Sequence, residues 1–171
     1  YVGRSKSKRA VDRSLNSDRM ILLLTQKDSN DEDPGADQLY MSGTVALIVR
    51  MLKLPDGRLR VLVQGISRVK VTLIKDDGRI IKAKVRVIED KEPKRQSIKD
   101  KALVKNVREK FEQSARMDEQ IPNEIFVIVE NIDEPGKLAD IIAANLDLKI
   151  SDSEKILAEE RSIKRLAKVY E

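Results

Sequence analysis

The residue types of a serine–lysine catalytic pair occur near the start of the sequence, at Ser5, Lys6, Ser7 and Lys8. The sequence contains neither histidine nor cysteine, so few other pairs of nucleophile and base are available. A lysine acts as a base when burial favours its neutral form. These four residues belong to a charge-rich segment that we expect to be an exposed helix. We therefore interpret them as helix surface and predict no catalytic residue.

Acidic residues between positions 28 and 37 supply the oxygen atoms that calcium prefers as ligands. A looped calcium site also needs a glycine at its sixth position and a glutamate at its twelfth. Counted from Asp31, these positions hold Ala36 and Ser42. The lack of histidine and cysteine removes most transition-metal sites as well. We predict a solvated loop with a Pro-Gly turn, and no metal site.

Phosphate binding by a glycine-rich loop requires a pattern such as Gly-x-x-x-x-Gly-Lys-Ser/Thr. The seven glycines occur singly, at predicted turns and bends, and none belongs to such a pattern. We therefore expect no nucleotide and no other cofactor on this chain.

Positive charge is concentrated in the first half of the sequence. Residues 1–90 hold 18 Lys and Arg against 12 Asp and Glu, a net +6, whereas residues 91–171 hold 16 against 17, a net −1. Clustered cations could bind DNA or RNA without sequence preference. Stacking aromatics are scarce and a helix-turn-helix signal is missing, so we favour a solubilising face that discourages pairing of strand edges. The candidate nucleic-acid face comprises Arg58, Arg60, Arg68, Lys70, Lys82, Lys84 and Arg86.

Protein binding leaves a different signal, which is apolar side chains exposed on a sheet. Leu39 and Tyr40 follow the acidic loop, and Met51 and Leu54 lie at the end of a predicted hairpin. We nominate these four residues as contacts for a protein partner. For each of them taken alone, the hydrophobic core is the favoured place.

Two Asp-Gly turns, at 55–57 and 76–78, predict two antiparallel hairpins in residues 1–90. An Asp-Gly pair between apolar runs is a strong hairpin signal, because glycine accepts the positive φ of tight turns. Gly65 is expected to form a bulge or bend between the hairpins. We predict a helix at 4–17 and strands at 20–24, 44–53, 58–64, 66–75 and 79–89.

The second hairpin alternates between apolar and charged residues. Period two with one apolar face predicts a sheet that is packed on one side and solvated on the other. Several short antiparallel strands favour a small barrel or sandwich-like sheet. The predicted packed side carries Val69, Val71, Leu73, Ile81, Ala83, Val85 and Val87.

Beyond residue 90 the apolar period changes to 3.6, which predicts helices. A helix at 97–118 places four residues on one stripe, namely Val104, Val107, Phe111 and Ala115. Segment 124–130 is rich in β-branched residues, which favours a strand. We nevertheless predict a short helix there, because Pro122 suits a first turn. One face of that helix would hold Ile121, Ile125, Val129 and Ile132.

Two more helices are expected in the second half. One begins at 133–135 and ends near Leu146, and the other runs from Ser151 to the end of the chain. The Ser-Asp-Ser-Glu run at 151–154 is a capping box, in which serine and glutamate satisfy free backbone N–H groups. We expect this last helix to continue beyond Glu171.

The apolar runs are far shorter than the roughly 20 residues needed to span a bilayer. The absence of cysteine fits a reducing compartment. We therefore expect a cytoplasmic protein without a membrane partner.

Several blocks of the sequence carry a resemblance to a known family, and they extend over nearly the whole chain. The blocks are 1–7, 22–28, 37–46, 52–57, 61–68, 121–124 and 131–140. In this order they resemble the amino-terminal domain of the bacterial ATP-dependent protease family Lon. Ser5 is a departure, since the family usually has glutamate there.

The resemblance implies an α+β fold in two parts. Residues 1–90 would form a small antiparallel β-barrel-like, PUA-like subdomain with one short helix, lacking strands that normally precede Tyr1. Residues 91–171 would form an α-helical bundle whose last helix leads toward an ATPase domain. That absent domain would bind ATP and Mg²⁺, and a serine–lysine protease domain would follow it.

The resemblance also implies a role in recognising unfolded or damaged protein substrates and in assembling a homohexamer. Arg4 and Lys6 match a basic motif of the family and are further candidates for substrate contact. The chain itself would be non-catalytic. Two alternatives remain open, a nucleic-acid-binding module and a free-standing Lon-like adaptor.

Overall fold

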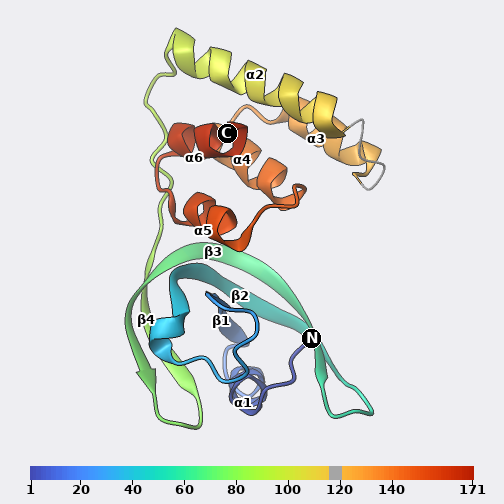
Figure 1. The fold of residues 1–171 in the computed structure, drawn as a ribbon, viewed down its shortest axis with the longest axis vertical. Helices are drawn as coiled ribbons and strands as arrows, with labels where there is room; N and C mark the ends of the chain where they lie inside the picture. Colours follow the sequence, from blue (N-terminus) through green and yellow to red (C-terminus); the bar gives the residue numbers. More distant parts are fainter. Residues whose placement is uncertain (116–120) are drawn as a thin grey trace. The chain divides into compact units, whose positions relative to one another are not determined.

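The computed structural model describes residues 1–115 and 121–171. They form two compact units, Tyr1–Ile88 and Glu89–Glu171. The first unit contains α1 (Ser5–Leu15), β1 (Met20–Gln26), the 3₁₀ helix η1 (Ala36–Gln38), β2 (Leu39–Lys53), β3 (Leu59–Asp76) and β4 (Ile81–Val87). The second contains α2 (Ile98–Ala115), α3 (Asn123–Asn131), α4 (Pro135–Ala144), α5 (Ile150–Ala158) and α6 (Ser162–Tyr170). The predicted α+β fold class is confirmed (Figure 1).

The four strands of the first unit form one antiparallel sheet in the order β1-β2-β3-β4. Both predicted Asp-Gly turns are present, and Gly57 and Gly78 have φ values of 77° and 76°. The sheet curls over α1 (Figure 1), which gives the β-barrel-like shape expected from the sequence.

The prediction of separate strands at 58–64 and 66–75 is wrong, because β3 continues through Gly65 as one strand of 18 residues. The predicted bulge is present: Gly65 pairs with Ala46 and Ser67 with Val45, so Ile66 is the extra residue. A bulge increases local twist and bends a strand without ending it.

The core of the first unit lies between α1 and the inner face of the sheet. The buried residues of this cluster are Val11, Ile48 and Leu59, with exposed fractions of 2%, 0% and 5%. Burying side chains of this size contributes about 1.5–3 kcal/mol each. The partly buried residues packed against them are Val2, Leu15, Ile21, Met51, Val61 and Val63.

The predicted packed side of the second hairpin is only half correct. Val69 and Val71 are buried, whereas Leu73, Val85 and Val87 are 41%, 39% and 50% exposed. A register shift between Val71 and Leu73 interrupts the alternation. In addition, β4 is an edge strand with a neighbour on one side only.

The second unit is built around one apolar cluster. As predicted, Val104, Val107 and Phe111 of α2 are buried in it, while the side chain of Ala115 and positions 116–118 lie outside the described residues. The helix predicted for 124–130 is confirmed as α3, and the Phe126 ring packs 6.1 Å from that of Phe111. The cluster also includes Val129, Leu138, Ala139, Ile142 and Leu166.

The single last helix predicted from Ser151 is wrong, because α5 ends at Ala158 and α6 begins at Ser162. The segment that enters the unit inserts at this break. The Lys91 N–H donates to the carbonyl oxygen of Glu160 at 2.8 Å, and the Ser162 N–H donates to that of Lys91 at 3.4 Å. These long-range bonds satisfy backbone groups that would otherwise continue the helix.

The predicted capping box is also wrong. Helix α5 already begins at Ile150, its N-cap is Lys149, and no side chain caps it. Glu154 is 7% exposed, so its side chain lies inside the unit rather than at a free helix end.

A buried arginine joins three segments of the second unit. Arg165 of α6 has an exposed fraction of 0%. Its Nη1 and Nη2 atoms donate to the two carboxylate oxygens of Asp90 at 2.7 and 2.8 Å, and its Nε lies 3.0 Å from Asp140 of α4. Bidentate pairing of this kind is strong and geometrically specific. The Ser162 hydroxyl donates to Glu92 at 2.7 Å and adds a second link to the same entering segment.

Candidate protein-binding surface

The two cations of the family motif are held by contacts within the first unit. Arg4 donates to Gln26 Oε1 at 2.5 Å and to the Asp31 carbonyl oxygen at 2.7 Å. Lys6 Nζ lies 3.1 Å from carboxylate oxygens of both Asp33 and Asp76. These contacts connect α1 with the acidic loop and with the β3–β4 turn. Contact with a substrate stays a prediction for both residues.

The charges around Lys6 shift pKa values in opposite directions. Hydrogen bonds to Asp33 and then Asp76 raise the pKa of Lys6. The backbone N–H of Gly78, followed by the Lys6 ammonium, lowers the pKa of Asp76. Both shifts favour the charged forms, so the link is maintained over a wide pH range.

The four apolar candidates from the sequence occupy different environments. Leu39 is 8% exposed, so it lies in the core, which the sequence analysis favoured for each of the four residues taken alone. Met51 packs against the core of the first unit. Tyr40 and Leu54 are half-buried. Their role as partner contacts stays a prediction.

The seven candidate nucleic-acid cations fall into two groups along β3. Arg58 pairs with Asp56 at 2.6 Å and, like Arg60, lies near the Tyr1 ring. Arg60 and Arg68 are separated by eight positions of β3, with the bulge at Ile66 between them. Nucleic-acid binding by the seven cations stays a prediction.

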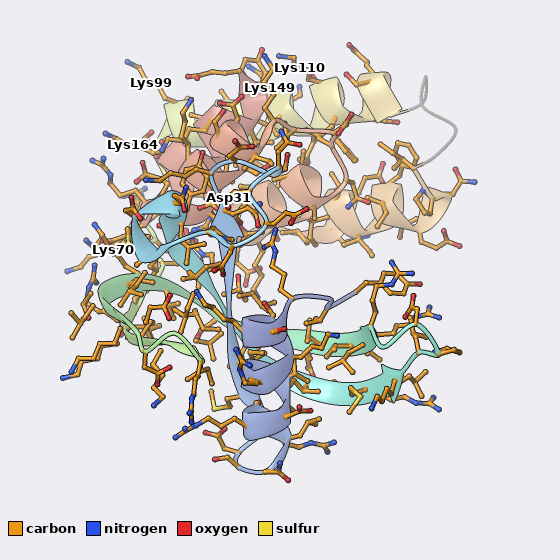
Figure 2. The ribbon with its side chains drawn as sticks, turned by 60° about the horizontal axis from the view of Figure 1, so that its bottom comes forward. Asp31, Lys70, Lys99, Lys110, Lys149 and Lys164 are labelled. Atoms are coloured by element: carbon orange, nitrogen blue, oxygen red, sulfur yellow. The ribbon has the colours of Figure 1, made fainter. Side chains whose placement is uncertain are left out.

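The second group lies on the β3–β4 hairpin. Lys70 is directly opposite Arg86, and Lys82 is directly opposite Lys75 and 3.9 Å from Asp77. Figure 2 shows the Lys70 side chain extending away from the ribbon. The other members of this group are Arg68, which is directly opposite Thr44 on β2, and Lys84, which is directly opposite Leu73 on β3.

An open groove of about 800 Å³ lies between α1, β1 and the β3–β4 turn. Its lining includes Lys6, Arg9 and Asp33. These polar groups are already engaged, since Lys6 contacts Asp33 and Arg9 Nε donates to the Arg79 carbonyl oxygen at 2.7 Å.

Exposed apolar side chains gather on the other side of the sheet, opposite α1. The register decides which residues share this side, because directly opposed residues of paired strands point the same way. Ile48 pairs with Val63 in the inner core, so their neighbours Leu47 and Leu62 point outward. We name this surface the apolar outer face and define it by Leu47, Val49, Leu52, Leu62 and Ile66.

Most of the apolar outer face is accessible. Val49, Leu52, Leu62 and Ile66 are 46%, 45%, 59% and 54% exposed, and Leu47 is half-buried. On β1, Met20 is directly opposite Leu47 and is 43% exposed. Contiguous exposed apolar side chains of this kind mark interaction surfaces.

Two β-bulges each add an exposed apolar side chain to this face. Ile48 pairs with Val63 and Arg50 with Leu62, so Val49 is an extra residue on β2, as Ile66 is on β3. Each bulge places two consecutive side chains on the outer side. The sequence analysis missed the face, although the continuous apolar run 45–49 was a usable signal. A strand that is apolar without alternation has two apolar sides.

The described residues contain no group of three or more acidic residues placed to hold a metal ion. Of the helices in the described part of the chain, none has the length and apolar character needed to cross a membrane.

The family model of the ATP-dependent protease La (LON) substrate-binding domain matches residues 1–171. The chain belongs to this family. It is 44% identical over 170 residues to a Lon protease of Trichlorobacter lovleyi, a match that covers 99% of the chain and 21% of that protein. It is also 42% identical to a Lon protease of Geobacter metallireducens, covering 100% of the chain and 21% of that protein. This Lon substrate-binding domain therefore spans about a fifth of the length of these relatives.

A solved structure supports the same fold. The N-terminal domain of a Mycobacterium avium complex Lon protease superimposes with a TM-score of 0.70, covering 99% of this chain and 85% of that one. The two chains are 18% identical, so the likeness concerns the fold alone.

Proposed function

We propose that this Lon substrate-binding domain holds apolar segments of unfolded or damaged proteins on its apolar outer face. It would do so as the non-catalytic recognition part of a longer ATP-dependent serine protease. The observation that carries the proposal is the uncovered apolar surface of β2 and β3, where Leu62 and Ile66 are the most exposed members.

Energetics favour weak binding. Covering a half-exposed leucine or valine contributes about 1 kcal/mol, which is roughly half of the full burial term. Five such side chains give about 5 kcal/mol, and ordering a flexible substrate opposes this gain. A gain of about 5 kcal/mol alone corresponds to about 0.2 mM, so with the opposing cost we expect a dissociation constant of about 1 mM or weaker for one domain and one segment.

Weak binding suits an assembly. In a homohexamer, six copies of the domain could engage several segments of one unfolded chain, and avidity would raise the overall affinity. A folded protein buries its apolar segments, so it would escape recognition. ATP, Mg²⁺ and peptide hydrolysis would belong to other domains of the full-length protein, in the cytoplasm.

The test is binding of a permanently unfolded, fluorescently labelled protein to the 171-residue chain. The double variant Leu52→Gln/Leu62→Gln should weaken binding roughly thirtyfold, because it removes two apolar contacts of about 1 kcal/mol each. Leu73→Gln is the matched control, since Leu73 is 41% exposed on β3 but lies outside the face. Equal binding by the double variant and the unsubstituted chain would contradict the proposal, as would peptidase activity of the isolated chain.

Nucleic-acid binding remains the second function suggested by the sequence. The β3–β4 cations would carry it, and such binding should be strongest at low ionic strength. Negligible binding of duplex DNA at low salt would dispose of it.

A further inference from the structure

Two arginines stand among the side chains of the apolar outer face. Arg50 is directly opposite Leu62, and Arg60 is directly opposite Leu52. Both arginines therefore point to the outer side of the sheet, with Leu52 and Leu62 beside them. The bulge at Val49 is the reason that Arg50 faces outward, since strict alternation after Ile48 would turn it inward.

The parts of β2 and β3 that form this face contain no acidic residue, and Asp76 at the end of β3 is paired with Lys6. The sequence from 39 to 53 and from 59 to 75 contains no Asp or Glu. Asp56 lies in the turn between these strands, where its carboxylate pairs with Arg58 at 2.6 Å. Within the described part of the chain, the Arg50 side chain makes no hydrogen bond or ion pair, and the Arg60 guanidinium lies 5.9 Å from the centre of the Tyr1 ring.

We propose that Arg50 and Arg60 give the apolar outer face a charge preference. It selects apolar segments that carry acidic side chains next to the apolar ones, and it discriminates against segments that carry Lys or Arg there. This inference rests on the proposed function and adds a selection rule to it.

The chemistry supports both halves of the preference. A guanidinium forms bidentate hydrogen bonds with a carboxylate, and its planar group lies well against apolar surface. An apolar segment bound across Leu52 and Leu62 would partly exclude water, which strengthens such a pair. A bound lysine or arginine would instead meet the like charges of Arg50 and Arg60.

The size of the preference follows from the exposure of the site. Exposed ion pairs contribute little individually, so two of them should change affinity by roughly threefold to tenfold. The preference should shrink when the salt concentration rises from about 50 mM to about 500 mM, because salt screens exposed charges.

The experiment uses two disordered, labelled peptides with the same apolar residues. One peptide carries two glutamates among them and the other carries two lysines. Fluorescence anisotropy measures the affinity of each for the 171-residue chain and for Arg50→Gln/Arg60→Gln. Lys82→Gln/Lys84→Gln is the control, because it removes the same net charge from β4 and leaves the face intact. Circular dichroism verifies that each variant is folded.

The unsubstituted chain should bind the glutamate peptide roughly threefold to tenfold more tightly than the lysine peptide. Arg50→Gln/Arg60→Gln should bring the two affinities together, and the control should preserve their ratio. An unchanged ratio in the arginine variant would overturn the inference, and so would an equal loss of preference in the control. Suppose that the charge preference is not found. If Leu52→Gln/Leu62→Gln still weakens the binding of both peptides, only the charge rule has failed. If that variant weakens the binding of neither peptide, the proposed function itself has failed.

Discussion

Lys6 and Asp76 are 70 positions apart in the sequence, yet the ammonium and the carboxylate lie 3.1 Å from each other. The same ammonium is 3.1 Å from Asp33 in the acidic loop. One side chain of α1 therefore holds two loops of the first unit. A residue that the sequence suggests as a substrate contact has a structural task in the folded domain.

The Lys6–Asp76 contact predicts a dependence of stability on pH. The folded-state pKa of Asp76 is lowered, chiefly by the Gly78 N–H and then by Lys6. Its contribution is therefore present above the unfolded pKa of about 4 and is lost as pH falls through the lower folded value. Lys6→Met should reduce the fall in melting temperature between about pH 5 and pH 2. Parallel pH profiles of Lys6→Met and the unsubstituted chain would contradict the role of this pair.

Gly136→Ala should destabilise the second unit. A Cβ at this position would lie 2.5 Å from Arg165 Nη2 and 2.9 Å from Glu92 Oε1. The buried guanidinium would have to move away from its carboxylates, at about 2–4 kcal/mol. Urea unfolding measures the loss. Gly65→Ala is the control, because the nearest atom to its Cβ is a Thr44 methyl carbon at 3.5 Å. Equal stability of the two variants would refute the explanation.

Arg165→Met should be more harmful than loss of an exposed arginine. The change removes the partner of Asp90 and Asp140, whose side chains are 36% and 44% exposed and therefore retain some hydration. We expect about 2–4 kcal/mol, somewhat below the value for a fully buried pair. Arg161→Gln breaks a 3.4 Å contact with Glu159 at an arginine side chain that is 56% exposed, and should change stability by less than about 1 kcal/mol. Chemical denaturation of both variants measures their free energies of unfolding, and an equal loss in the two would contradict the structural role of Arg165.

Substitution by glutamine should change the free energy of unfolding much more at Val63 than at the adjacent Leu62 on β3. Val63 packs against the core, so Val63→Gln should lower the free energy of unfolding by about 1.5–3 kcal/mol. Leu62 is 59% exposed on the apolar outer face, so Leu62→Gln should stay within about 0.5 kcal/mol of the unsubstituted chain. The same Leu62 variant should bind the unfolded protein less well. A large loss of stability at Leu62 would mean that this face belongs to the core.

Local patterns were sufficient where a few neighbouring residues decide the conformation. The Asp-Gly turns place Gly57 and Gly78 at positive φ, as the sequence predicts. Helix α3 forms despite its β-branched residues, because Val129 and its neighbours share one apolar face that packs in the core. The position of Gly65 also indicated the bulge, although the strand does not end there.

The candidate surface was less accessible to such reasoning. The sequence analysis nominated Leu39 and three other apolar residues as partner contacts while favouring the core for each, and Leu39 is buried. The register of β2 against β3, including the bulges at Val49 and Ile66, determines which apolar side chains point outward. A shift of one residue moves a side chain to the other face of a sheet.

By itself, the sequence determined the α+β class, the two hairpin turns, the helical second half and membership of the Lon substrate-binding family. Only the tertiary structure decided that the last helix breaks at residues 159–161, that Lys6 connects two loops, and that an apolar face remains uncovered. The reason is physical. Turn geometry and helix periodicity depend on neighbouring residues, whereas the Lys91–Glu160 and Lys6–Asp76 contacts form between segments that only the folded chain brings together.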